Sequence, residues 1–337
     1  MSAPHFSFVI PVFNRPSEVQ ELLESMTKLS GDHSFEVVIV EDGSTVSSKE
    51  VVQSFDQLLD IQYWSKLNTG PGDSRNYGMS QAKGDYFLIL DSDVILPENY
   101  LNEVTFALAK NHVDCFGGPD AAHSSFTNLQ KAINFAMTST LTTGGIRGGG
   151  SSKRNFQPRS FNMGLSRKAF ESSGGFGQIH PGEDPDLVLR LKKIGFRSAL
   201  FPKAIVFHKR RISWAKFYQQ VNHFGRVRPI LNSWHPESKR LTYWLPTLFL
   251  IGIPLSFLLL AIGVWQLAAI YGLYELALLV NAVIRTQSLV IGAMAVLAAN
   301  LQFIGYGLGF LKNSIRLKVS NKSAEELFPN QFFKLPV

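Results

Sequence analysis

The sequence predicts an α/β domain with a mostly parallel sheet flanked by helices, followed by C-terminal transmembrane helices. In the first half of the chain, short and continuously apolar segments alternate with amphipathic helical patterns, as they do in parallel sheets covered on both faces. In the last third, charged side chains almost disappear: between Tyr243 and Leu311 the only ones are Glu275 and Arg285. The composition therefore divides the chain near residue 240.

Five apolar segments are expected to be strands, because each is short and bounded by turn residues. Helices are expected from an N-cap at Ser17, after the Gly/Pro-rich turn at 68–72, and from Tyr100 to Lys110. Residues 144–160, rich in glycine, serine and basic side chains, are expected to form a mobile loop. The predicted strands are Phe6–Val12, Phe35–Val40, Ile61–Trp64, Tyr86–Leu90 and Val113–Gly117.

Polar clusters stand at the ends of three of these strands. They are Asn14 with Arg15, Glu41 with Asp42, and the segment Asp91–Asp93. In open α/β sheets, ligands bind beyond the carboxyl ends of the strands. The three clusters therefore predict one binding site at that edge of the sheet.

Asp91 and Asp93 are two positions apart at a strand end, so both carboxylates can project to the same side. Paired carboxylates suit a divalent cation such as Mg²⁺ or Mn²⁺, which would neutralise a diphosphate leaving group. His208 follows a short apolar strand at 204–207 and is either a third metal ligand or a structural histidine. The pattern predicts a divalent-metal site.

Two further features of the sequence can each be interpreted in two ways. Glu41 and Asp42 either accept hydrogen bonds from a nucleobase or ribose, or simply form a turn. Arg75 pairs either with phosphate oxygens or with a carboxylate such as Asp91. Both point to nucleotide chemistry if the binding alternatives hold.

Asp184 stands at a predicted helix N-terminus, with Glu183 and Asp186 beside it. The helix dipole favours an ionised carboxylate there, and such a carboxylate could accept a proton from an incoming hydroxyl group. The alternative is ordinary capping of the helix by Asp184 or Asp186.

These motifs occur in one chain order, and together they resemble a known family. They are Phe8–Asn14, Val40–Ser44, Asn68–Gly72 with Arg75 and Asn76, Asp91–Asp93, Phe161–Gly164, Gly174–Phe176, Gly182–Leu187 and Val206–His208. The ordered set resembles glycosyltransferase family 2, whose members have the Rossmann-like GT-A fold and transfer sugar from nucleotide sugars with inversion. The similarity spans about residues 5–230.

The resemblance implies a role for each matching residue. Asp184 would be the general base that deprotonates the acceptor hydroxyl, while Asp91, Asp93 and His208 would hold the divalent metal. The residues implied in binding the nucleotide-sugar donor are Pro11, Phe13, Glu41, Asp42, Arg75, Asn76, Asp91 and Asn162.

The chain also departs from the family pattern. Glu41 replaces an aspartate that is common in the family, and the Gln-x-x-Arg-Trp signature of processive synthases is missing from the region Gln219–Arg226. We therefore expect transfer of one sugar. The expected acceptor is a lipid-linked glycan or another membrane-associated hydroxyl compound in cell-surface polysaccharide or glycolipid synthesis.

Two other functions compete with this interpretation. A nucleotidyltransferase is disfavoured because Asn14, Arg15 and Pro16 stand where its Gly-rich phosphate loop would be. A non-catalytic, membrane-anchored nucleotide-sugar-binding protein remains the alternative. It is disfavoured because the carboxylates of Asp91, Asp93 and Asp184 are all present.

The apolar region predicts a membrane anchor. Of its stretches, Leu245–Val264 and Leu289–Leu311 are long enough to span, whereas 267–284 is marginal. Basic side chains flank the region on both sides, which would require an even number of crossings, so two or three helices remain open. The expected domains are a cytoplasmic GT-A domain (1–240), a membrane region (241–312) and a short basic tail (313–337).

Charge and cysteine content constrain the location. The segment from Lys203 to Arg240 is strongly basic, opposed only by Glu237, which suits anionic membrane lipids or substrate phosphates. No nucleic-acid motif accompanies it, so a nucleic-acid partner is not expected. The N-terminus lacks a signal-peptide pattern, and Cys115 is the only cysteine. We expect the first domain at the cytoplasmic side of the inner (plasma) membrane.

Overall fold

The computed structural model describes residues 4–144, 156–209 and 213–333. The chain forms two compact units, which are described separately below. The first comprises residues 1–123, 146–209 and 332–337, and the second comprises 124–145 and 210–331. Most of the expected mobile loop at 144–160 lies outside the described residues. The domain boundaries predicted near residues 240 and 312 rest on the apolar composition of the segment between them, whereas the two units are defined by packing. Those boundaries therefore stay a prediction.

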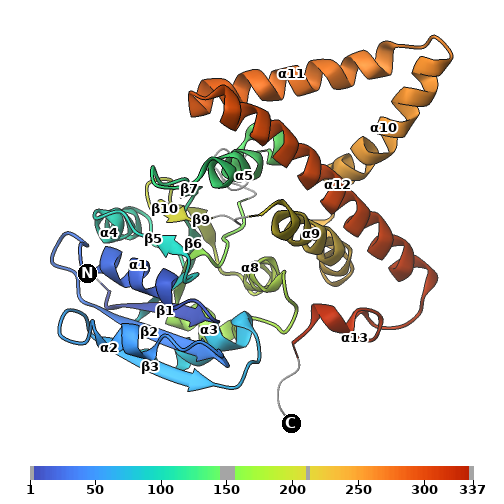
Figure 1. Ribbon diagram of the computed structural model, residues 1–337. Coiled ribbons are helices and arrows are strands. Elements are labelled where there is room, and N and C mark those ends of the chain that lie inside the picture. Colours follow the sequence, from blue (N-terminus) through green and yellow to red (C-terminus); the bar gives the residue numbers. More distant parts are fainter. Residues whose placement is uncertain (1–3, 145–155, 210–212, 334–337) are drawn as a thin grey trace. The chain divides into compact units, whose positions relative to one another are not determined.

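A seven-stranded sheet forms the centre of the first unit, in the order β3-β2-β1-β4-β8-β6-β9 (Figure 1). The neighbours β3, β2, β1 and β4 are parallel, whereas β8 runs antiparallel to both β4 and β6. The predicted mostly parallel sheet is thus confirmed. Its strands are β1 (Phe6–Val12), β2 (Phe35–Asp42), β3 (Ile61–Lys66), β4 (Tyr86–Leu90), β6 (Cys115–Gly117), β8 (Asn162–Ser166) and β9 (Ser198–Leu200).

Strand β8 was not among the predicted strands, because its sequence is neither continuously apolar nor β-branched. It lies in the middle of the sheet and is buried along its whole length. A Cβ on Gly164 would lie only 2.0 Å from the ring of Phe116. Glycine is therefore required there, because that ring packs directly over the strand.

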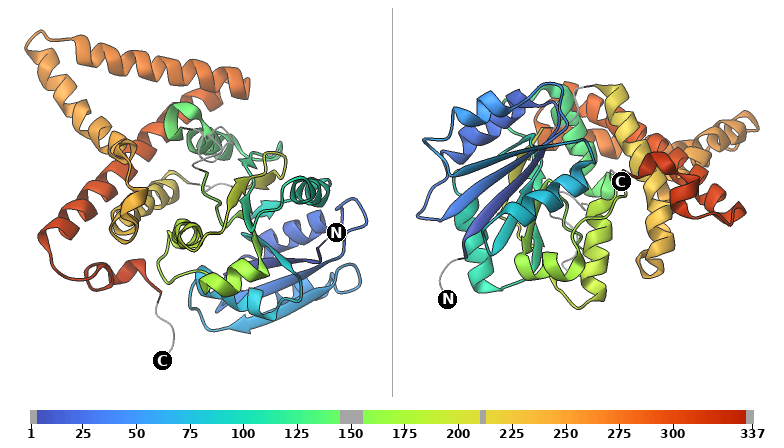
Figure 2. Two further views of the ribbon diagram at one scale, coloured as in Figure 1. Left: turned by 180° about the vertical axis from the view of Figure 1, so that it is seen from behind. Right: turned by 90° about the horizontal axis from the view of Figure 1, so that it is seen from below.

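Helices cover both faces of this sheet (Figure 2). Alternate side chains of β1 face opposite ways: Phe8 and Ile10 pack towards α1 and α4, and Val9 packs towards α3 and α8. This period of two is what places a core on each face. The helices are α1 (Pro16–Met26), α2 (Lys49–Gln53), α3 (Pro71–Gln81), α4 (Tyr100–Lys110), α7 (Arg167–Ser173) and α8 (Glu183–Lys193).

The expected N-cap at Ser17 is wrong. Helix α1 begins at Pro16, its N-cap residue is Arg15, and no side chain caps it. Proline suits the first helical position because its φ angle is already helical and the missing N–H would have no partner there. Ser17 consequently lies inside the first turn.

A second, three-stranded sheet lies in the same unit, in the order β5-β10-β7. Strand β10 pairs antiparallel with β5 and parallel with β7. In this register His208 lies opposite Val94, and Val206 lies opposite Asp120. The strands are β5 (Val94–Ile95), β7 (Asp120–Ala121) and β10 (Val206–His208).

The second unit is helical. Three of its helices are long and apolar enough to cross a membrane, by length and composition: Leu241–Ala261, Gln266–Thr286 and Leu289–Val319. Their side chains include many exposed large apolar groups, which indicates membrane association. The helices are α5 (Asn128–Thr138), α6 (Thr140–Thr143), α9 (Trp214–Trp234), α10 (Leu245–Ala261), α11 (Gln266–Thr286), α12 (Leu289–Val319) and α13 (Ala324–Leu327), with short 3₁₀ turns at Pro236–Ser238, Leu241–Trp244 and Pro329–Gln331.

Helix α12 packs closely against α9 (Figure 1). A Cβ on Gly305 or Gly309 of α12 would lie 2.7 Å or less from atoms of α9. The side chain of Asn222 donates to the carbonyl of Gly305 at 2.8 Å. Small residues and an interhelical hydrogen bond are the features that hold helices together in lipid, where the hydrophobic effect between helices is absent.

Candidate active site

Asp91, Asp93 and His208 lie together at one edge of the large sheet. Each offers a ligand atom, and these atoms all lie within 4.8 Å of one another. Asp91 follows the last residue of β4, and Asp93 precedes β5, whereas His208 ends β10. Residues more than a hundred positions apart are brought together because β10 pairs with β5.

Asp120 supports His208 from the far side. The Nδ1 atom of His208 lies 3.5 Å from Asp120 Oδ2, and its Nε2 atom lies 3.2 Å from Asp93 Oδ1. Asp120 begins β7, the strand that pairs with β10 on the side opposite β5. A carboxylate on the outer nitrogen of a ligating histidine fixes the orientation of the ring, so Asp120 can aim Nε2 at the site.

The donor atoms of this cluster fit a hard divalent cation. Arg15 pairs with Asp93 Oδ2, and Arg75 pairs with Asp91 Oδ1 at 2.7 Å, so each carboxylate keeps a second oxygen. Asp93 Oδ1 is buried and accepts no hydrogen bond from the described residues. Two carboxylate oxygens and one imidazole nitrogen are ligands that Mn²⁺ and Mg²⁺ sites use.

The charges around Asp93 keep it ionised. Burial alone would raise the pKa of this carboxyl group, but its neighbours His208 and Arg15 hold the pKa well below its usual range. An ionised carboxylate is the form that binds a cation.

The guanidinium group of Arg75 connects this cluster to helix α8. Its Nη2 atom donates to Asp91 Oδ1 at 2.7 Å, and its Nη1 atom donates to Glu183 Oε1 at 3.0 Å. The side chain is buried, and its guanidinium lies over the ring of Phe176, 5.4 Å from the centroid. The fork of Arg75 therefore holds the end of β4 and the first residue of α8 at the same edge. Of its two expected roles, the pairing with Asp91 is present.

Glu183 is also paired on its other side. Its carboxylate lies 3.2 Å from the Nδ1 atom of His180. Burial alone would raise the pKa of Glu183, but protonated His180 and Arg75 lower it to about 2. Burial would in turn lower the pKa of His180, but Glu183 raises it. Glu183 is thus a structural anion, which leaves its neighbour Asp184 as the candidate base.

Asp184 lies in the first turn of α8, where backbone N–H groups without a partner in the helix favour a negative charge. The N-cap residue of this helix is Gly182, so the alternative in which Asp184 or Asp186 caps the helix is wrong. The carboxylate of Asp184 lies 3.6 Å from Arg159 Nη1. The helix N-terminus and Arg159 thus give the Asp184 carboxylate a positive environment.

The carboxylates of Glu41 and Asp42 are buried and have partners within the protein. Asp42 accepts the backbone N–H groups of Thr69 and Gly70 at 3.0 and 2.9 Å and pairs with Lys66. Glu41 accepts the N–H of Ser48 and the hydroxyl of Tyr63. Both thus shape the loops at the sheet edge, and their contact with a nucleotide stays a prediction.

The remaining predicted donor-binding residues have different environments. Pro11 is half-buried, whereas the ring of Phe13 is 50% exposed and can face a ligand. The Asn76 amide pairs with both the N–H and the carbonyl of Phe176, at 2.8 and 2.9 Å. Asn162 is fully buried, accepts from Tyr100 and donates to the carbonyl of Ala204. The two asparagines thus hold backbone in place near the site.

The family model of glycosyl transferase family 2 matches residues 7–173. This segment contains β1 to β4 and the Asp91–Asp93 pair. Residues 7–173 therefore form a domain of glycosyltransferase family 2.

Two named proteins are similar in sequence to this chain. The succinoglycan biosynthesis protein ExoA of Rhizobium meliloti is 25% identical over 311 residues, which cover 90% of this chain and 92% of ExoA. The poly(ribitol-phosphate) beta-N-acetylglucosaminyltransferase TarS of Staphylococcus aureus is 33% identical over 113 residues. That match covers 32% of this chain and only 20% of TarS. The chain therefore corresponds to a small part of TarS.

A solved structure has a similar fold. It is the mannosyltransferase PcManGT of Pyrobaculum calidifontis, in complex with GDP-Man and Mn²⁺. The TM-score is 0.62, the sequences are 17% identical, and the match covers 90% of this chain and 88% of PcManGT. This likeness supports the GT-A fold of the family 2 domain.

Three residues of the site are not part of any motif found in the sequence. Asp120 and Arg159 stand outside every motif, and His180 precedes the Gly182–Leu187 motif. Asp120 begins the short strand β7, Arg159 precedes β8, and His180 lies in the turn before α8. Phe333 also contacts His180, with ring centroids 5.6 Å apart.

Replacing Arg75 by glutamine should destabilise the family 2 domain by about 3–5 kcal/mol, because Glu183 would stay buried with one partner fewer and Asp91 would lose its cation. Arg75→Lys should lose less, since it keeps the charge but cannot bridge two carboxylates. Hydrogen exchange of the α8 amides in the full chain measures this effect. The exposed Arg197→Gln is the matched control, and unchanged α8 protection in Arg75→Gln would contradict the account.

Replacing Asp120 by asparagine should weaken Mn²⁺ binding by about 10- to 100-fold, the usual cost of losing a carboxylate behind a ligating histidine. Titration of Mn²⁺ monitored by electron paramagnetic resonance measures this affinity. Asp85→Asn, which removes one exposed carboxylate outside the site, should leave it unchanged. Equal affinity in wild type and Asp120→Asn would mean that Asp120 does not orient His208.

Proposed function

We propose that the protein is an inverting glycosyltransferase that moves one sugar from a nucleotide-diphosphate sugar to a hydroxyl acceptor. The observation that carries this proposal is the bridge of Arg75, which joins a divalent-metal ligand set to the helix of a candidate base. Membership of glycosyltransferase family 2 supports the reaction class. PcManGT, which has the same fold, is described with GDP-Man and Mn²⁺, and this supports both the donor class and a divalent metal.

The reaction assigns a task to each part of the site. Asp184 accepts the proton of the acceptor hydroxyl as its oxygen attacks the anomeric carbon. The bond between that carbon and the nucleoside diphosphate breaks on the opposite face, and its electron pair leaves with the phosphate oxygen. Asp91, Asp93 and His208 would hold the divalent cation, which neutralises the charge of the leaving diphosphate when bound. Arg15 and Arg75 hold the two aspartates in position.

The donor would lie over the carboxyl ends of β1, β2 and β4. Phe13 offers an exposed ring to the nucleobase, and Pro11 lies beside the same strand end. Glu41, Asp42, Asn76 and Asn162 would act mainly by holding the surrounding loops, since their side chains already have protein partners.

The acceptor is proposed to be a lipid-linked glycan or another membrane-associated compound in cell-surface polysaccharide or glycolipid synthesis. The names of ExoA and TarS, with the three apolar helices, support this class of acceptor. The basic residues on both sides of the apolar region favour a cytoplasmic catalytic domain at the inner membrane.

Asp184→Asn should reduce kcat by about 10²- to 10⁴-fold while leaving the donor KM nearly unchanged, because a general base acts in the transition state. The assay follows nucleotide release by detergent-solubilised protein from UDP-, GDP- and dTDP-sugars with Mn²⁺ or with chelator. A membrane-lipid extract supplies the acceptor.

Glu171→Gln, an exposed carboxylate on α7, is the matched control and should keep full activity. Undiminished turnover in Asp184→Asn would remove Asp184 from the mechanism. Nucleotide binding by the wild type without release from any donor would instead identify a non-catalytic nucleotide-sugar-binding protein.

A further inference from the structure

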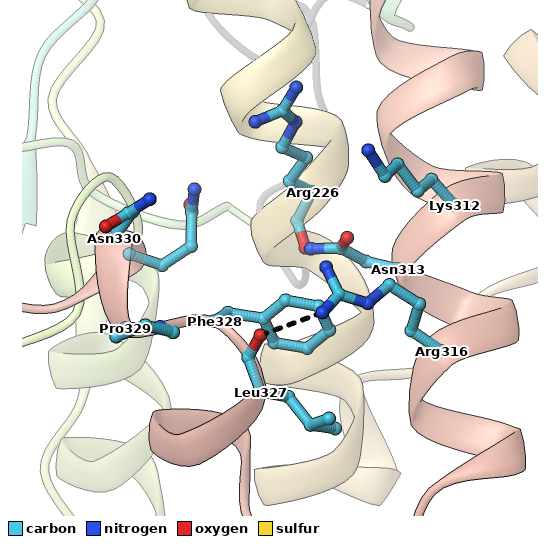
Figure 3. Close-up of a pocket in the computed structure, with 9 residues that line it drawn as sticks. Arg226, Lys312, Asn313, Arg316, Leu327, Phe328, Pro329 and Asn330 are labelled. Carbon is cyan, nitrogen blue, oxygen red and sulfur yellow. Dashed lines mark hydrogen bonds between the residues drawn. The ribbon is translucent and has the colours of Figure 1, made fainter.

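A basic pocket lies within the helical unit, where α12 leaves its apolar stretch (Figure 3). Its volume is about 360 Å³, within the size range of small-molecule sites. In Figure 3, Arg226 of α9 lies beside Lys312 and Arg316 of α12. The remaining lining residues are Asn313, Leu327, Phe328, Pro329, Asn330 and Gln331.

The charge of this pocket is uncompensated. It contains three cations, and no aspartate or glutamate lines it. Lys312 and the guanidinium of Arg226 have no ion pair with any described residue, and Arg226 Nε is buried without a hydrogen-bond partner among them. A buried donor without a partner costs free energy, which an anionic ligand would recover.

The walls of the pocket are held by specific contacts. Asn313 donates to the carbonyl of Arg226 at 2.8 Å, which fixes α9 against α12. Arg316 donates to the carbonyl of Leu327 at 3.2 Å, and its guanidinium lies over the ring of Phe328, 4.9 Å from the centroid. The segment after α13 is thereby tied to α12, so the cations surround a formed cavity.

An exposed apolar surface leads to this cavity. Leu308, Lys312, Ile315 and Val319 recur at helical spacing along one face of α12. Leu308 is 41% exposed and Ile315 is 53% exposed. Lys312 follows directly after the apolar stretch Leu289–Leu311, so a membrane span that ends at Leu311 would place it where lipid headgroups meet water. A ligand here would have an acyl chain along α12 and an anionic group among the cations.

We propose that this pocket binds the phosphate headgroup of a membrane lipid. Basic pockets between membrane helices at the headgroup level are suited to such groups. A free anion would use the cations but not the exposed apolar face of α12. The proposal concerns the helical unit alone and does not depend on the reaction proposed for the family 2 domain.

The test measures lipid binding to the full chain in detergent by native mass spectrometry. The probes are dioleoyl phosphatidic acid, dioleoyl phosphatidylcholine and inorganic pyrophosphate. Lys312→Gln with Arg316→Gln should weaken phosphatidic acid binding about 30-fold, from two cations near a lipid phosphate. Lys318→Gln with Lys322→Gln removes the same charge outside the pocket and should change it by less than about threefold.

Three results would overturn the proposal. Equal losses in the two double variants would mean diffuse attraction to the basic tail. Phosphatidylcholine bound as tightly as phosphatidic acid would mean that the cations do not select an anion. Pyrophosphate bound as tightly as phosphatidic acid would identify a soluble ligand. Lys312→Gln alone replaces the double variant if that protein does not fold, because the Lys312 side chain is exposed and has no described partner.

Discussion

The buried guanidinium of Arg75 is the interaction on which the arrangement of the site depends. A buried cation must be paired, and its two partners are Asp91 at the end of β4 and Glu183 at the start of α8. These residues are 92 positions apart, yet the rigid fork sets the separation of their carboxylates. Asp184 follows Glu183 directly, so the same contact brings the candidate base to the edge that carries Asp93 and His208.

Several polar residues of the predicted binding edge also build the loops around it. Asn14 adopts a positive φ of 55°, which asparagine tolerates, and its side chain accepts the N–H groups of Thr45 and Val46. Asp42 does the same for Thr69 and Gly70. A site that binds a flexible, highly charged donor needs such fixed loops, because preorganised groups need no rearrangement during the reaction.

The parallel strands, and the strand ends at which polar residues gather, could be predicted from the sequence. They could be predicted because continuous apolar runs and helical periodicity are local signals. It was insufficient for β8, which is central but contains Asn162 and Gly164, and for β5 and β7, which have two residues each. Asp120 and Arg159 were missed for the same reason: their role follows from long-range pairing. The Ser17 cap failed because Pro16 takes the first helical position.

The most direct test of one metal-dependent donor site at this edge is calorimetric titration of UDP and GDP into the wild-type chain, with Mn²⁺ and with chelator. One nucleotide diphosphate should bind at least about tenfold more tightly with Mn²⁺, because Asp91, Asp93 and His208 would hold an ion whose charge offsets that of the diphosphate. Asp93→Asn should abolish that difference. Equal affinity with Mn²⁺ and with chelator in the wild type would contradict the account.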